Sequence, residues 1–133
     1  MSHTFLVGRD SVVLDIGANQ GFYSMLAAAH GCRVVSFEPQ PECQRGLLAA
    51  RARNGFTDAQ LRLVPRPVSA RPRDVVVSSG ARVCALMYTP FASGGRVSPE
   101  RPAPHSVTST TVGEALPPAT SVRLAKVDVR RGG

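Results

Sequence analysis

The chain lacks tryptophan, has only three cysteines, and carries a single lysine, Lys126, beside fifteen arginines. An odd number of cysteines without any C-x-x-C spacing argues against a disulfide framework and against a zinc site. We therefore expect Cys32, Cys43 and Cys84 to be free thiols that behave as small apolar residues. Free thiols favour a reducing cytoplasm as the compartment.

Long apolar runs are also missing. No window of about 18 apolar residues is present, so no segment is expected to span a membrane. Residues 1–9 lack the basic start and the long apolar region of a signal peptide, which again favours the cytoplasm. A length of 133 residues predicts one domain at most.

The net charge of +7 raises the possibility of nucleic-acid binding. However, the arginines are scattered along the chain, aromatic residues are few, and no nucleic-acid-binding module is recognisable. The pattern favours a solvated arginine-rich surface. A basic nucleic-acid-binding module stays as an alternative.

The first half of the chain alternates between strand and helix patterns. Residues 11–16 form a short β-branched run typical of a strand covered on both faces. The next apolar residues recur with helical spacing up to Gly31, so we expect one buried helical face. That face would contain Phe22, Met25, Leu26 and Ala29.

A second strand is predicted over 32–37 and a third over 61–64. Between them, Pro41 suits the first position of a helix that ends at Asn54-Gly55. The residues expected to face inward from this helix are Cys43, Leu47 and Leu48. Together these elements predict a βαβαβ unit with a parallel sheet.

The second half is less regular. Residues 74–79 and 82–89 are predicted as two antiparallel strands joined by a turn at Ser79-Gly80. Residues 90–106 are rich in Pro, Gly and Ser and predict a loop that contains His105, a residue within reach of a site. A last strand is expected over 122–129.

A glycine turn follows the first strand. Asp15 precedes Gly17 by two residues, Asn19 replaces the middle glycine of a dinucleotide fingerprint, and Gly21 closes the turn. Glu38 ends the second strand, where an acid accepts hydrogen bonds from ribose hydroxyls. A carboxylate at the mouth of the pocket would repel a pyrophosphate and attract the ammonium and sulfonium groups of S-adenosylmethionine (SAM). The motif therefore favours SAM over a dinucleotide.

Residues 15–24, Asp-Ile-Gly-Ala-Asn-Gln-Gly-Phe-Tyr-Ser, resemble the SAM-binding motif of the FkbM-type methyltransferases. Further segments similar to that family are 37–41, 54–55, 64–70, 108–116 and 126–129. The resemblance covers nearly the whole chain and is weakest over 74–106. It departs from the family pattern at Arg130-Arg131, where the family has Glu-Gly.

The resemblance implies a class I methyltransferase, which has a Rossmann-like, three-layer αβα fold with strand order 3-2-1-4-5-7-6. The chain would supply strands one to four, so residues 1–133 are expected to form a single partial domain. Its parts would be a SAM-binding βαβαβ half (1–70), a hairpin and Pro/Gly-rich insertion (71–106), and a linker with the fourth strand (107–133). The sheet would end at an exposed apolar edge, which makes self-association through that edge an expected behaviour.

The resemblance also implies the reaction, methyl transfer from SAM to a hydroxyl of a sugar or natural-product small molecule. The residues expected to bind the cofactor are Asp15, Gly17, Asn19, Gly21, Tyr23 and Glu38. Asp128, at the tip of the last strand, is the candidate base, and no metal is expected. An inactive, truncated remnant of such an enzyme stays as a second alternative.

Overall fold

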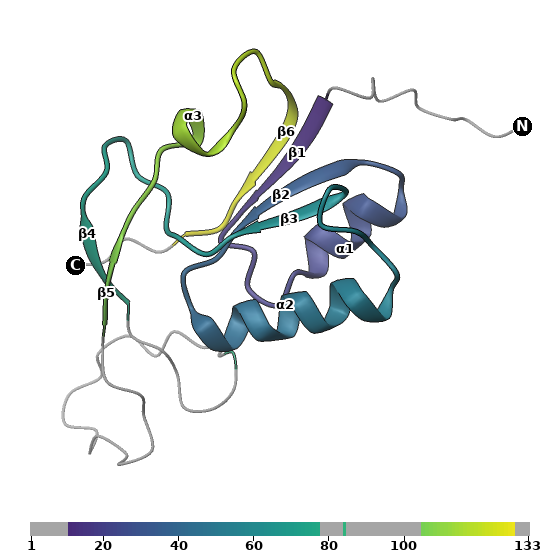
Figure 1. Cartoon of the computed structure of the whole chain (residues 1–133), viewed down its shortest axis with the longest axis horizontal. Helices are drawn as coiled ribbons and strands as arrows, with labels where there is room; N and C mark the ends of the chain where they lie inside the picture. The colour runs from purple at the N-terminus through teal and green to yellow at the C-terminus, as the bar shows by residue number, and fades with distance from the viewer. Residues whose placement is uncertain (1–10, 78–83, 85–104, 130–133) are drawn as a thin grey trace, which may run out of the picture.

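Four parallel strands form the main sheet, in the order β3-β2-β1-β6 (Figure 1). The computed structural model describes residues 11–77, Cys84 and residues 105–129. β1 (Ser11–Ile16) lies between β2 (Arg33–Phe37) and β6 (Ser121–Val127), and β3 (Leu61–Val64) lies beside β2. The predicted parallel βαβαβ unit is confirmed, and the architecture is a mostly parallel α/β sheet compatible with a Rossmann-like fold.

Two helices cover one face of this sheet, α1 (Phe22–Ala29) and α2 (Pro41–Arg53) (Figure 1). The core on this side consists of Ala18, Ala28, Val34, Leu47 and Leu61. α2 begins at a proline and ends at Asn54, as predicted. Its inward face is narrower than expected, because Leu48 is 38% exposed.

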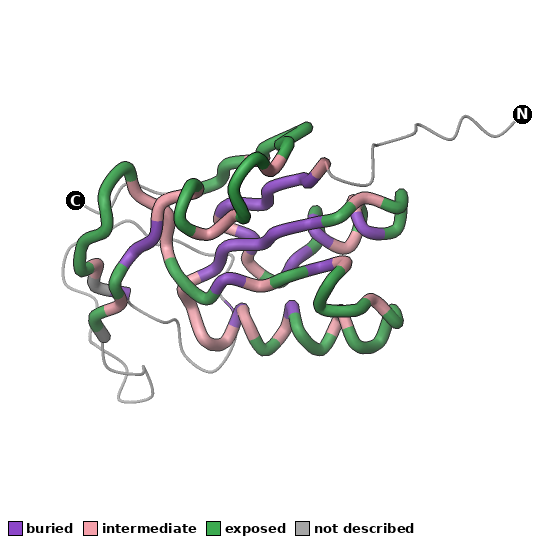
Figure 2. Tube along the Cα trace, turned by 45° about the horizontal axis from the view of Figure 1, so that its top comes forward, coloured by how far each residue is buried: buried purple, intermediate pink, exposed green. Residues whose placement is uncertain are grey.

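The opposite face packs against α3 (Val112–Ala115), a single turn that begins with a capping box between Thr111 and Glu114. The core on this side consists of Val12, Leu14, Ile16, Val35, Phe37 and Val64. Figure 2 shows the buried central strands between exposed outer segments. The sheet therefore has helices on both faces, although the α3 layer is thin.

The predicted buried face of α1 is right only at Met25, which is half-buried and packs against the core. Phe22 is 72% exposed and Leu26 is 48% exposed, whereas Ser24 and Ala28 are buried. Small side chains at this spacing let the helix lie close to the sheet, where Ser24 reaches polar groups of β1 and β2. Apart from Met25, the residues that the apolar pattern selected lie on the side of the helix that faces away from the strands.

The second half contains an antiparallel pair that was not predicted: β4 (Asp74–Val77) pairs with β5 (His105–Thr108). The predicted partner of 74–79, the strand over 82–89, lies outside the described residues except for Cys84. The predicted loop therefore extends too far, because His105 begins a strand. A local turn signal could not reveal a pairing between segments so far apart in the chain.

The prediction of three free thiols is also wrong. Cys43 on α2 and Cys84 form a disulfide with a Cα–Cα distance of 4.6 Å, and Cys32 is free. The bridge joins residues 41 positions apart, a separation that no local spacing motif encodes. Two of the three cysteines therefore no longer support the expectation of a reducing compartment, which was based on free thiols. Among the described residues, no helix has the length and apolar character needed to cross a bilayer.

β6 is the edge of the main sheet in the part of the chain that the structure describes, with β1 as its neighbour. Several of its apolar side chains, and that of Val129 just beyond it, are exposed: Val122, Leu124, Val127 and Val129. The expected exposed apolar edge is therefore present.

Candidate functional site

The turn between β1 and α1 contains three residues with positive φ, at Gly17 (76°), Asn19 (55°) and Gly21 (85°). A Cβ atom on Gly17 would lie 2.1 Å from the carbonyl oxygen of Asp128, and one on Gly21 would lie 2.8 Å from Leu47 Cγ. These glycines allow the turn to pack against the end of β6 and against α2. Packing alone therefore requires glycine at both positions.

Every backbone N–H group of residues 17–21 donates a hydrogen bond within the chain. The acceptors are, in chain order, the carbonyl oxygen of Phe37 (twice), Glu38 Oε2, Asn19 Oδ1 and the carbonyl oxygen of Ala18. A pyrophosphate-binding turn needs free N–H groups that point at the anion. Residues 17–21 therefore leave no backbone N–H group free to bind a pyrophosphate.

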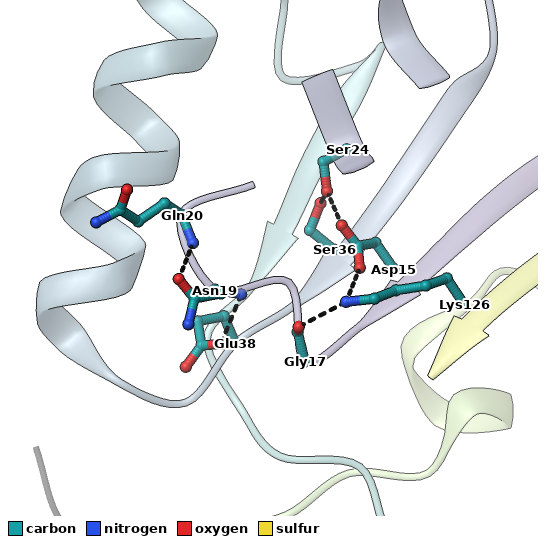
Figure 3. A network of polar contacts seen from close by, with 8 residues as sticks. All are labelled: Asp15, Gly17, Asn19, Gln20, Ser24, Ser36, Glu38 and Lys126. Carbon is teal, nitrogen blue, oxygen red and sulfur yellow. Dashed lines mark hydrogen bonds and ion pairs between the residues drawn. The ribbon is translucent and has the colours of Figure 1, made fainter. Parts of the chain in front are cut away.

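Glu38 lies directly after β2 and is 3% exposed. Its Oε2 accepts from the N–H of Asn19 and its Oε1 from the N–H of Gln40, both at 2.8 Å (Figure 3 shows the Asn19 contact). Burial raises the pKa of Glu38, and these backbone hydrogen bonds oppose that rise. Each carboxylate oxygen has a second lone pair, so Glu38 retains acceptor capacity for a ligand.

Asp15, on β1, is only 1% exposed, which corrects the expectation of an open carboxylate at the pocket mouth. Its Oδ2 accepts from Ser24 Oγ at 2.6 Å, and Ser24 Oγ lies 2.7 Å from Ser36 Oγ. Its Oδ1 lies 3.1 Å from Lys126 Nζ as an ion pair but receives no aligned hydrogen bond from the described residues. The buried carboxylate is therefore held on one side by Ser24 and on the other by an ion pair with Lys126.

Lys126 completes a network of polar contacts that we call the polar cluster (Figure 3). Its members are Asp15, Gly17, Asn19, Gln20, Ser24, Ser36, Glu38 and Lys126. The sequence did not predict Lys126 as a site residue. It stands opposite Asp15 in the β1–β6 register. Its Nζ donates to the carbonyl oxygen of Gly17 at 3.0 Å and lies 5.2 Å from the centre of the Tyr23 ring (Figure 3 shows the contact with Gly17). Two sequence signals pointed to Lys126: it is the single lysine of the chain, and it begins the segment 126–129 that resembles the FkbM-type family.

The remaining predicted residues lie at the border of the cluster. Tyr23 is 54% exposed and makes an edge-to-face contact with Phe22 at 5.3 Å. Asp128 is exposed and follows the end of β6, where its N–H donates to the carbonyl oxygen of Ile16 at 2.9 Å. The structure thus brings the predicted residues of β1, β2 and β6 to one end of the sheet. His105, by contrast, belongs to the separate β4–β5 pair.

The Cys43–Cys84 disulfide borders the polar cluster. Cys84 Sγ lies 3.0 Å from Asn19 Oδ1, so the disulfide reaches the glycine turn.

A cavity lies apart from the polar cluster. It has a volume of about 600 Å³ and lies on the α3 side of the sheet, and none of its lining residues belongs to the cluster. Within the described ranges, no group of three His, Cys, Asp or Glu residues is arranged to hold a metal ion.

No family model, curated protein or solved structure matches the chain.

Proposed function

We propose that this chain binds SAM at the carboxyl ends of β1, β2 and β6 and transfers its methyl group to a hydroxyl of a small molecule, in the manner of the FkbM-type methyltransferases. One observation carries the proposal. Two buried carboxylates, Asp15 and Glu38, flank a glycine turn whose N–H groups are all engaged. Such a turn offers little to a phosphate and favours a ligand with cationic groups and hydroxyls.

The two carboxylates would have different roles in the site. Glu38, beside the turn, would accept hydrogen bonds from the ribose hydroxyls through the lone pairs that its contacts with Asn19 and Gln40 leave over. Asp15 Oδ1 is buried and ion-paired with Lys126 Nζ at 3.1 Å, so Asp15 would support the turn from behind rather than contact the cofactor. Glu38 and the glycine turn are therefore the parts of the site that fit the group that the motif predicts.

When bound, SAM supplies a methyl group that its sulfonium has already activated. The chain's contribution would be to hold the acceptor hydroxyl in line with that methyl group. Asp128, exposed at the tip of β6 next to Gly17, is the candidate base for the hydroxyl proton.

The proposal is tested by calorimetric titration with S-adenosylhomocysteine, the product form of the cofactor, and with NADH. We expect the first to bind and the second not to bind. Glu38→Gln should weaken binding by about tenfold or more, because one ribose acceptor becomes a donor. Asp58→Asn is the matched control, since Asp58 is exposed and pairs with Arg51 at the far end of α2.

Failure of the folded wild-type chain to bind S-adenosylhomocysteine would overturn the proposal, as would equal binding by the Glu38→Gln variant. Methyl transfer is then measured with labelled SAM and a panel of hydroxylated small molecules. Asp128→Asn should abolish most turnover while leaving cofactor binding intact.

A further inference from the structure

The cavity on the α3 side of the sheet is lined by segments that lie far apart in the chain. Its volume of about 600 Å³ is within the usual range of small-molecule sites. Its walls come from the end of β3, from the segment before β4 and from the segment that leads from β5 into α3. The charged residues of the lining are Arg62, Arg66 and Glu114. Two cationic side chains and one anionic side chain therefore border the same space.

Both arginines are held by main-chain carbonyl oxygens. Arg62 Nη1 donates to the carbonyl oxygen of Ala115 at 2.7 Å, and Arg66 Nε donates to that of Thr108 at 2.8 Å. Each of these bonds uses one of the five N–H donors of a guanidinium group. Because the side chains are already fixed and keep most of their donors, a ligand that binds them costs little further ordering.

The positive charge at the cavity is only partly balanced. Neither arginine forms an ion pair with an acidic residue in the described ranges, where the basic members of ion pairs are Arg45, Arg51 and Lys126. The carboxylate of Glu114 is engaged in the capping box of α3, where its Oε2 accepts from the N–H of Thr111 at 3.4 Å. The cavity therefore keeps a net positive charge and free guanidinium donors.

We propose that this cavity binds a doubly charged oxyanion, as found in inorganic phosphate and in phosphate esters. A guanidinium group has parallel N–H donors that match two oxygens of a phosphate, and charge-assisted hydrogen bonds are stronger than neutral ones. Two guanidinium groups beside one carboxylate favour a dianion over a monoanion. Pro65 and Pro72 provide apolar wall for an organic group attached to the phosphate. The site shares no residue with the polar cluster, so it does not depend on SAM binding.

The test is an NMR titration of the 15N-labelled full chain with inorganic phosphate at constant ionic strength. The folded wild type should bind phosphate with a Kd of about 1 mM. The amide signals that shift should belong to the cavity lining, with Arg66, Ser109 and Thr110 among them. Acetate, a monoanion, should bind at least about tenfold more weakly. Glycerol 3-phosphate distinguishes the two sources of the anion: tighter binding than inorganic phosphate assigns the cavity to phosphate esters, and equal binding assigns it to the free anion.

Three variants test the charged residues. Arg66→Gln should weaken phosphate binding by about tenfold or more, because one guanidinium group is lost. Arg53→Gln is the matched control and should bind as the wild type does, since Arg53 is an exposed arginine at the end of α2 and does not line the cavity. Glu114→Gln should strengthen binding by about two- to fivefold, because it removes the negative charge. Glutamine can still complete the capping box, so α3 should be retained in this variant.

If Arg66→Gln does not fold, Arg66→Lys takes its place and should also weaken binding, because lysine keeps the charge but lacks the planar fork of donors. Absence of saturable phosphate binding by the folded wild type overturns the proposal. Equal affinities in the Arg66 variant and in Arg53→Gln also overturn it, as do signal shifts spread over exposed arginines outside the cavity. None of these outcomes bears on the binding of S-adenosylhomocysteine, which is measured separately.

Discussion

The backbone N–H of Asn19 donates a hydrogen bond of 2.8 Å to Glu38 Oε2, across 19 residues of chain. The end of β2 therefore holds the turn that follows β1. Asn19 has a positive φ of 55°, a conformation that asparagine tolerates better than most residues. The residue predicted to read the ribose thus also shapes the turn beside it.

This carboxylate gives the chain a pH-dependent stability. Burial raises the pKa of Glu38 above the 4.5 of an ordinary glutamate, so the folded state holds the proton to higher pH than the unfolded chain does. The stability contributed by the protonated group is fully present below the unfolded pKa and is lost as pH rises through the folded pKa. Urea unfolding of the wild type and Glu38→Gln, compared between about pH 4 and 7, measures it. The wild-type free energy of unfolding, minus that of the variant, should fall with pH and then level off; a rising difference would contradict the prediction.

Gly17 should tolerate no side chain. Gly17→Ala places a Cβ 2.1 Å from the carbonyl oxygen of Asp128, in addition to the strain of its φ of +76°. Gly31→Ala is the matched control, because Gly31 has a φ of +83° and nothing within 4 Å of the added atom. We expect the control to lower the free energy of unfolding by about 1–2 kcal/mol, the cost of left-handed backbone. Gly17→Ala should exceed it by at least about 2 kcal/mol in chemical denaturation; equal losses would show that Asp128 does not restrict this position.

The Cys43–Cys84 disulfide predicts how many thiols react. In the unreduced, denatured chain, a colorimetric thiol reagent should detect one thiol, Cys32, and after reduction it should detect all three. Cys84→Ser should lower the free energy of unfolding by about 4 kcal/mol under oxidising conditions, given the 41-residue separation. Cys32→Ser is the control and should leave the bridge intact. Three reactive thiols before reduction would show that the bridge does not form.

The orientation of α1 can be tested by introducing asparagine once on its buried side and once on its exposed side. Ala28→Asn introduces a polar amide at a position that is 2% exposed, so it should lower the free energy of unfolding by about 2 kcal/mol or more. Leu26→Asn, on the exposed side, should change it by less than about 1 kcal/mol. Thermal and chemical denaturation measure both variants. A larger loss in the free energy of unfolding for Leu26→Asn than for Ala28→Asn would contradict this orientation of the helix.

Local patterns in the sequence determined the strands and helices of the first half. The β-branched run at 11–16, Pro41 at a helix start and Asn54-Gly55 at its end are signals carried by neighbouring residues, and each was found where predicted. Parallel pairing followed from the strand–helix alternation, since right-handed crossovers leave few other arrangements. The convergence of Asp15 and Glu38 at one end of the sheet followed from the same rule.

Tertiary structure alone decided what those residues touch. The ion pair of Lys126 with Asp15, the Cys43–Cys84 bridge and the pairing of β4 with β5 each join segments far apart in the chain. Contacts of this kind depend on which surfaces meet when the sheet closes, and no local spacing encodes them. The sequence by itself determined which residues end the strands; only packing decided that one carboxylate is buried against a lysine and that the other holds the turn.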